Sequence, residues 1–154
     1  MCDLPKVLAV DDDQGVATCL EKVLRIRFRG RIAVTAMTDS VAARRWIKEV
    51  NPEVIVTDLD MPDVDGFALT CDARQWNPDV QVIIHSGHVD PCVDKLARKL
   101  GANECVSKNG DFVGLCAAIE RALERLPSAR GPAPPSGPIA DNMQSWPENQ
   151  TPTG

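Results

Sequence analysis

Short apolar runs and helical patterns alternate along roughly the first 126 residues of this chain. The runs are rich in β-branched residues, which is typical of strands that are buried on both faces of a sheet. They predict strands over residues 6–10, 31–36, 53–57, 80–85 and 104–107. Between these runs the apolar residues recur at helical spacing instead.

The helical patterns predict five helices. Helical spacing in the first is set by Val16, Leu20, Val23, Leu24 and Arg27. The next three helices are expected over residues 40–50, 66–75 and 91–100, and the last runs from an Asp111 N-cap to Leu126. Alternating strands and helices favour an α/β fold, with a parallel sheet, helices on both faces and right-handed crossovers.

The composition changes after Leu126. Seven of the twelve prolines fall in residues 127–154, where apolar periodicity is almost absent. We therefore expect one folded domain over residues 1–126 and a disordered, proline-rich tail over residues 127–154. A length of 154 residues suits one core of this kind. Trp146 in the tail is a candidate anchor for a partner, but a stray aromatic residue in a spacer is the simpler interpretation.

Charge and cysteine usage narrow the function. The chain has 17 Lys and Arg against 22 Asp and Glu, a net charge of -5, which disfavours direct binding to nucleic acid. Its six cysteines form no C-x-x-C pair and no signal peptide precedes them, so we expect reduced thiols in a cytoplasmic protein. No apolar stretch approaches the roughly 20 residues of a membrane helix.

Acidic residues stand where two of the predicted strands end. Asp11 and Asp12 follow one apolar run, and Asp58 follows another. Packing does not explain carboxylates at the ends of buried strands, and adjacent like charges repel unless a cation lies among them. Ligands of open α/β sheets bind at this edge, where Ser86 and Lys108 also follow strands. The set predicts a divalent-metal site that handles a phosphoryl group.

These residues carry a family resemblance. The chain contains Asp11-Asp12, then Asp58-x-x-Met61-Pro62-x-x-Asp65-Gly66, then Ser86-Gly87, then Gly101-Ala102-Asn103 followed by Lys108. This pattern resembles the receiver domain of two-component response regulators over roughly residues 4–126. The resemblance implies a flavodoxin-like, doubly wound sheet of five parallel strands in the order 2-1-3-4-5, similar to the chemotaxis regulators.

The resemblance also implies the site. Asp58 is then the phosphoacceptor, and Asp11 and Asp12 bind Mg²⁺ together with Asp58 and the backbone carbonyl of Asp60. Ser86 is the switch hydroxyl, and Lys108 pairs with the acceptor or its phosphoryl group.

The partners implied are a sensor histidine kinase or phosphotransfer protein and a downstream protein target, with no membrane or nucleic acid. The protein is thus expected to be a stand-alone response regulator of a phosphorelay. It would be a phosphoacceptor rather than an enzyme with a separate substrate.

Two positions depart from the family pattern. Asn109 follows Lys108 where the family usually has a proline joined by a cis bond. Because a cis bond before another residue costs about 3 kcal/mol, this loop is either trans or strained. Cys105 stands where the family commonly has an aromatic residue, and it is too small to swing inward and report phosphorylation.

Other polar residues near the motif have simpler interpretations. Asp13, Asp63 and Asp65 are expected to be turn or solvent residues. By strand alternation His85 points away from Ser86 and is expected to be structural. His88 and Asp60 occupy positions that, in the family, tune the lifetime of the phosphorylated state.

A second class of protein competes with the receiver. Asp58-Leu59-Asp60 after an apolar strand also resembles haloacid-dehalogenase-type phosphatases, in which Asp58 would be the nucleophile and Asp60 the acid and base. Those enzymes place a metal-binding acidic pair after the lysine, whereas here the pair comes first. A pseudo-receiver would lack an acceptor or a metal ligand, and none is missing.

Overall fold

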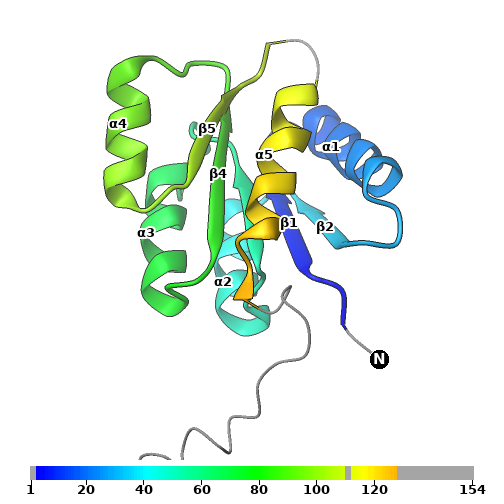
Figure 1. Cartoon of the computed structure of the whole chain (residues 1–154). Helices are drawn as coiled ribbons and strands as arrows, with labels where there is room; N and C mark the ends of the chain where they lie inside the picture. The colour runs from blue at the N-terminus through cyan, green and yellow to red at the C-terminus, as the bar shows by residue number, and fades with distance from the viewer. Residues whose placement is uncertain (1–2, 110–111, 128–154) are drawn as a thin grey trace, which may run out of the picture.

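The structure is a computed structural model that describes residues 3–109 and 112–127 (Figure 1). One parallel sheet has the strand order β2-β1-β3-β4-β5, which confirms the predicted flavodoxin-like topology. The strands are β1 (Lys6–Val10), β2 (Ala33–Met37), β3 (Val54–Thr57), β4 (Gln81–Ser86) and β5 (Glu104–Ser107). All five predicted strands are therefore present, and the largest displacement is at β2, which starts two residues later than expected.

Helices cover both faces of this sheet (Figure 1). They are α1 (Gln14–Arg27), α2 (Ser40–Val50), α3 (Gly66–Trp76), α4 (Pro91–Leu100) and α5 (Val113–Glu124). One apolar cluster joins the sheet to α1 and α5, and a second joins it to α2, α3 and α4. No helix in the described part of the chain is long and apolar enough to cross a membrane.

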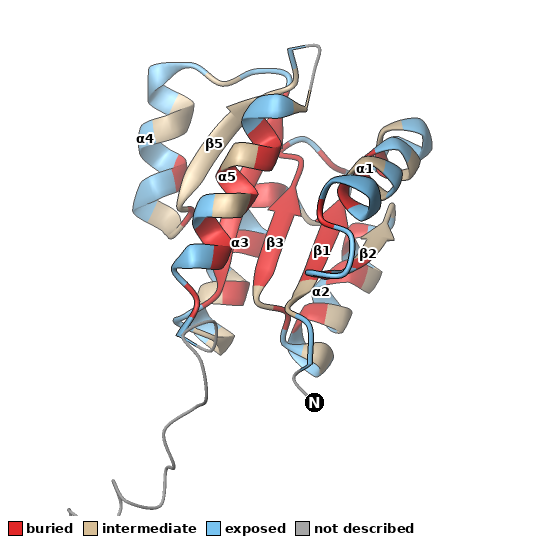
Figure 2. Cartoon of the chain, turned by 45° about the vertical axis from the view of Figure 1, so that its right-hand side comes forward, coloured by how far each residue is buried: buried red, intermediate tan, exposed pale blue. Residues whose placement is uncertain are grey.

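The central strands are buried on both sides because their alternate residues enter different clusters. In β1, Val7 and Ala9 pack toward α1 and α5, while Leu8 and Val10 pack toward α2 and α3. Figure 2 shows β1 and β3 as buried elements between two layers of helices. The near-continuous apolar runs in the sequence follow from this double burial.

Aspartates start four of the five helices. Asp13, Asp39, Asp65 and Asp90 are N-caps whose side chains accept hydrogen bonds from the first turns of α1, α2, α3 and α4. The N-cap of α5 is Phe112, which makes no capping hydrogen bond through its side chain, and Asp111, expected at that position, lies outside the described residues. Helix α5 ends at Glu124 rather than Leu126, although Leu126 is buried. The predicted tail lies outside the described residues from residue 128 onward.

Candidate functional site

Backbone pairing continues one residue beyond the strands and brings the predicted site residues to one edge. The Asp58 amide donates to the Val10 carbonyl at 2.9 Å, so Asp58 lies beside the start of the Asp11 loop. On the other side the Lys108 amide donates to the Ser86 carbonyl at 2.8 Å. Residues from four segments of the sequence therefore meet at the carboxyl ends of the strands.

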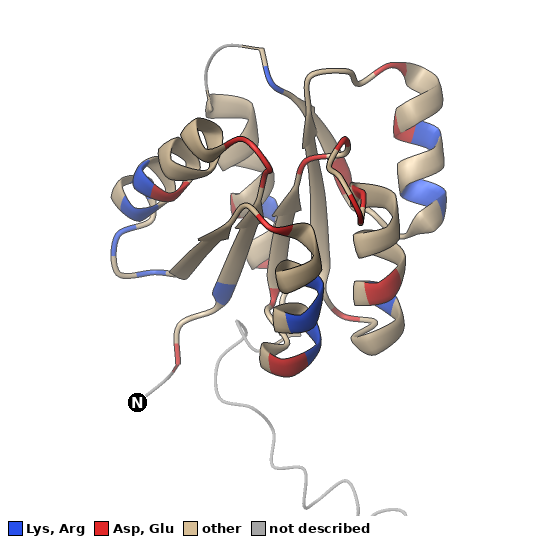
Figure 3. Cartoon of the chain, turned by 180° about the vertical axis from the view of Figure 1, so that it is seen from behind, with Lys and Arg blue, Asp and Glu red and all other residues tan. Residues whose placement is uncertain are grey.

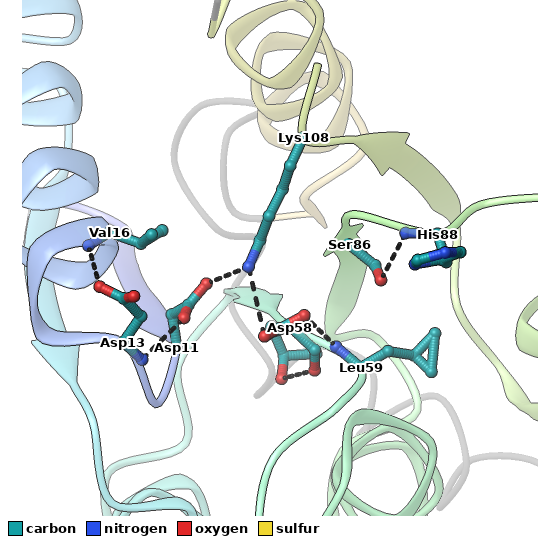
Figure 4. A network of polar contacts seen from close by, with 9 residues as sticks. Asp11, Asp13, Val16, Asp58, Leu59, Ser86, His88 and Lys108 are labelled. Atoms are coloured by element: carbon teal, nitrogen blue, oxygen red, sulfur yellow. Dashed lines mark hydrogen bonds and ion pairs between the residues drawn. The ribbon is translucent and has the colours of Figure 1, made fainter. Parts of the chain in front are cut away.

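Three carboxylates and one ammonium group form the centre of the site, and Figure 4 shows Asp11, Asp58 and Lys108 of this set. One carboxylate oxygen from each of Asp11, Asp12 and Asp58 lies within 4.8 Å of the others. Lys108 Nζ lies 2.6 Å from Asp11 Oδ2 and 3.2 Å from Asp58 Oδ2. The lysine thus bridges two of the acids, which offsets part of the repulsion between them.

Asp58 is held by short-range hydrogen bonds. Its Oδ1 accepts from the Leu59 amide at 2.7 Å, and its backbone carbonyl accepts from Thr57 Oγ1 at 2.8 Å. Burial raises the pKa of the Asp58 carboxyl, the charge of Lys108 opposes this rise, and the charge of Asp11 adds to it. The carboxylate is thus oriented, buried at 8% exposure, and more basic than an ordinary aspartate.

Lys108 and Asp11 form the most buried ion pair of the site. Burial alone lowers the pKa of Lys108, but the hydrogen bond to Asp11 and the charges of Asp11 and Asp58 outweigh it, so the net pKa is raised. Asp11 also accepts from the Asp13 amide at 2.9 Å through Oδ1. Lys108 is therefore a cation at neutral pH, and its Nζ is held beside the Oδ2 atoms of Asp11 and Asp58.

The donor set fits a hard divalent cation. Mg²⁺ prefers oxygen ligands and keeps several waters, so a few carboxylates on an accessible edge suffice to hold it. Asp12 is exposed, and its side chain makes no hydrogen bond or ion pair within the described part of the chain. Its carboxylate is available to a cation, whereas Asp11 and Asp58 already share Lys108.

Ser86 is the last residue of β4 and is buried. Its Oγ accepts a hydrogen bond from the His88 amide at 3.2 Å, which leaves the hydroxyl hydrogen free to donate (Figure 4). Within the described residues no hydrogen bond joins Ser86 to Asp58. His88 and Asp60 are exposed, and neither belongs to the three-carboxylate cluster.

His85 points away from Ser86, as strand alternation predicted, and it is also within electrostatic reach of the site. The ring does lie on the opposite face from Ser86, but that face carries α5, and the ring centroid is 6.0 Å from that of Phe112. Its Nδ1 is buried without a hydrogen-bond partner. Burial, together with the smaller effect of the Lys108 charge and against the opposing effect of Asp11, lowers the pKa of His85 to about 4. His85 is therefore a neutral, buried imidazole within electrostatic reach of both residues.

The two departures from the family pattern have structural answers. The described residues contain no cis peptide bond, so Lys108 and Asn109 are joined in trans. Cys105 is half-buried and packs against the cluster of α2, α3 and α4. Burial raises the pKa of the Cys105 thiol to about 11, with Asp94 adding to the rise, so it stays protonated.

The neighbouring acids are turn and cap residues, as expected. Asp13 Oδ1 accepts from the Val16 amide and Asp65 Oδ1 from the Ala68 amide, each at the start of a helix. Asp63 has φ 70°, a left-handed conformation that aspartate tolerates in turns. None of the three belongs to the carboxylate cluster of the described residues.

Sequence reasoning missed a link between α2 and the loop after Asp58. Ser40 Oγ donates to the Pro62 carbonyl at 2.7 Å and accepts from the Val64 amide at 3.2 Å. Ser40 is buried at the start of α2. No local signal marks this contact, because the partners are separated by more than 20 residues in the sequence.

Comparison with known proteins identifies the family. The sequence matches the response regulator receiver domain over residues 7–120. The chain therefore belongs to the receiver domains of two-component response regulators. The comparisons give no support to the phosphatase alternative.

Curated relatives are longer than this chain. It is 33% identical over 123 residues to the transcriptional regulatory protein PrrA of Mycobacterium leprae, covering 79% of this chain and 51% of that protein. It is 30% identical over 128 residues to the DNA-binding transcriptional regulator NtrC of Azospirillum brasilense, covering 82% of this chain and 26% of that protein. The chain thus spans about half or a quarter of the length of these relatives.

Solved structures agree with the fold. A response regulator receiver domain protein from Clostridium thermocellum is 30% identical with a TM-score of 0.70, covering 79% of this chain and 96% of that one. The beryllofluoride-activated NtrC4 receiver domain dimer is 29% identical with a TM-score of 0.70, covering 77% and 96%. A CheY-like response regulator receiver domain protein from Methanospirillum hungatei shares the fold. It is 21% identical with a TM-score of 0.72, covering 80% of this chain and 97% of that one.

Proposed function

We propose that this protein accepts a phosphoryl group on Asp58 from a phosphohistidine of a sensor histidine kinase or phosphotransfer protein. The observation that carries the proposal is the position of Lys108 Nζ, 3.2 Å from Asp58 Oδ2, beside the carboxylates of Asp11 and Asp12. A carboxylate with a fixed cation and a site for a second cation is suited to receive a dianionic group.

The transfer follows from these groups. A carboxylate oxygen of Asp58 attacks phosphorus, the phosphorus–nitrogen bond of the donor breaks, and the donor imidazole leaves with its electron pair. Lys108 neutralises charge on the phosphoryl oxygens, and the free hydroxyl hydrogen of Ser86 donates to one of them. Oδ1 of Asp58, held by the Leu59 amide, keeps the carboxylate oriented during attack.

Mg²⁺ is the cation that we propose for the carboxylate cluster. Asp11, Asp12 and Asp58 would hold it, with the Asp60 carbonyl as a further ligand. When bound, it would supply positive charge at the developing phosphoryl oxygens. The residues of the chain do the rest: they orient the acceptor and pair with the transferred group.

We propose that the domain ends near residue 126 and that the signal passes to a protein target. Burial of Leu126 against the core supports this boundary. The net charge of -5 supports a protein target rather than direct contact with nucleic acid. The free cysteines of the described residues fit a reducing, cytoplasmic setting.

Intact-mass measurement with acetyl phosphate and Mg²⁺ tests the proposal. The native protein should gain one phosphoryl group, and Asp58→Asn should gain none. Asp63→Asn, which removes an exposed carboxylate of the same loop, should be phosphorylated like the native protein. Equal phosphorylation of Asp58→Asn would assign the acceptor elsewhere, and sustained hydrolysis of p-nitrophenyl phosphate that is lost in Asp60→Ala would restore the phosphatase alternative.

A further inference from the structure

Helix α2 presents a basic stripe on the side that faces away from the sheet (Figure 3). Val41, Arg44, Arg45 and Lys48 are exposed and follow the spacing i, i+3, i+4, i+7. This spacing places them on one face of the helix. The buried residues of α2, Ser40, Ala43 and Ile47, lie on the side that packs toward the sheet.

Helix α3 supplies the second wall of a groove beside this stripe. Arg44 Nε lies 2.7 Å from Asp72 Oδ2, and Lys48 Nζ lies 5.6 Å from the ring centroid of Trp76. Together Val41, Arg44, Arg45, Lys48 and Trp76 line a groove of about 270 Å³. Its lining combines three cations with an aromatic ring and an aliphatic side chain.

The charge of the groove is opposite to that of the chain. The whole protein has a net charge of -5, yet three cationic side chains line this groove, and among the residues that the structure describes only Arg44 has an acidic partner there. Arg45 and Lys48 form no ion pair within the described residues, and the exposed Glu49 nearby forms none either. Both cations therefore remain available to carboxylates from another molecule.

We propose that this groove binds a short acidic segment of a partner protein. Its carboxylates would pair with Arg45 and Lys48, and an apolar side chain between them would pack on Val41 and Trp76. The stripe from Val41 to Lys48 spans about 10 Å along the helix, at 1.5 Å per residue. That length matches about three residues of extended chain.

The lining favours a peptide over other anions. Phosphate sites of proteins commonly use backbone amides of glycine-rich loops or helix N-termini, whereas this groove is lined by side chains that run along α2 from its first turn to its last and by the last residue of α3. Two of its five lining residues, Val41 and Trp76, are apolar, which suits a segment that mixes acidic and apolar residues. The groove lies apart from the carboxylate cluster, so its occupancy can be tested without phosphorylation.

The probe is the peptide acetyl-Glu-Asp-Leu-Glu-Glu-amide, titrated into the full chain while the indole resonance of Trp76 is followed by NMR. Trp76→Phe assigns that resonance among the three tryptophans. Saturable shifts of the Trp76 indole that weaken as salt is raised are expected. The neutral analogue with Gln and Asn should produce no saturable shift.

Charge variants locate the binding. The double variant Arg45→Gln with Lys48→Gln should raise the dissociation constant of the peptide at least about fivefold. Val41→Glu, which places a negative charge at an exposed position of the groove, should raise it to a similar extent. Lys95→Gln with Lys99→Gln on α4 removes the same charge from another exposed helix and should change it less than about twofold.

The proposal is overturned by a lack of saturation at millimolar peptide, by equal binding of the neutral peptide, or by equal losses in the α4 control. It is also overturned if inorganic pyrophosphate or phosphatidylserine vesicles bind the groove more tightly than the peptide. A failure of Asp58 phosphorylation would leave all of these readouts unchanged.

Discussion

Gly66 lies so close to Asp58 that a Cβ atom at Gly66 would stand 2.3 Å from the Asp58 carbonyl oxygen. The same Cβ would be 3.0 Å from the Leu59 Cα, and the Gly66 amide donates to the Leu59 carbonyl at 2.9 Å. The first turn of α3 therefore presses directly on the segment that carries the proposed acceptor. Glycine is needed here for space between two backbones, since its φ is not in the left-handed region.

Gly66→Ala should destabilise the fold by about 1–3 kcal/mol, because the rigid backbone of Asp58 must move to make room. It should also slow phosphorylation of Asp58 by displacing the acceptor. Urea unfolding and intact-mass time courses measure the two effects. Gly114→Ala is the matched control: its Cβ would lie 3.7 Å from Val106 Cγ1, an ordinary contact. The control should be neutral or slightly stabilising, and equal losses in both variants would contradict the argument.

Alanine variants of Asp12 and Asp11 should differ in folding stability, although both should weaken Mg²⁺ binding. Asp12→Ala should keep the native stability within about 0.5 kcal/mol, or gain slightly as repulsion is relieved, because its exposed carboxylate has no partner in the described chain. Asp11→Ala should lose about 1–3 kcal/mol, because it removes acceptors from Lys108 and from the Asp13 amide.

Metal binding is measured as the change in melting temperature when Mg²⁺ is added, in the native protein and in both variants. The native protein should melt at a higher temperature with Mg²⁺, and both variants should lose most of that shift. A Mg²⁺-dependent shift that survives undiminished in both would place the metal elsewhere.

His85 should make the protein less stable in mild acid. Its folded-state pKa of about 4 lies below the ordinary value of 6.5, so between these values the unfolded chain binds more protons than the folded one. The stability from the neutral, buried imidazole is complete above about pH 6.5 and is lost as the pH falls toward 4. This loss amounts to at most about 3 kcal/mol.

His85→Leu is the matched variant, because it keeps an apolar side chain in the buried position and removes the titrating group. Urea unfolding from pH 7 to pH 4.5 should show a smaller loss of stability in His85→Leu than in the native protein. The raised pKa of Asp58, caused mainly by burial, acts in the opposite direction but is present in both proteins. Identical pH profiles would show that His85 is not desolvated in solution.

Asp60 and His88 should set the lifetime of the phosphorylated protein. Both are exposed and lie outside the carboxylate cluster, so replacing them leaves the acceptor intact. Asp60→Asn and His88→Ala should change the decay rate of phosphorylated Asp58 without preventing its formation. Intact-mass measurements after removal of the phosphodonor follow the decay. Loss of formation in either variant would assign that side chain to the transfer step itself.

The sequence alone determined the elements, their order and the residues at the strand ends. Apolar runs predicted β1 and β3 because strands buried on both faces have no polar alternation. Asp11, Asp58 and Lys108 stood out because carboxylates and an ammonium at the ends of such runs have no packing role. Those are local signals, and the family motif is a local signal as well.

Tertiary structure decided what lies across the sheet and between its layers. The close approach of Gly66 to Asp58 looked like ordinary turn chemistry in the sequence, yet it comes from two backbones in contact. His85 was predicted to point away from Ser86 and to be structural, and it does lie on the other face. Only the packed structure shows that this face carries α5 and that the charges of Lys108 and Asp11 reach the ring. The spacing of residues along the chain predicts which face of the sheet a side chain lies on. Which residues it contacts there depends on how the helices pack, and the sequence pattern does not contain that information.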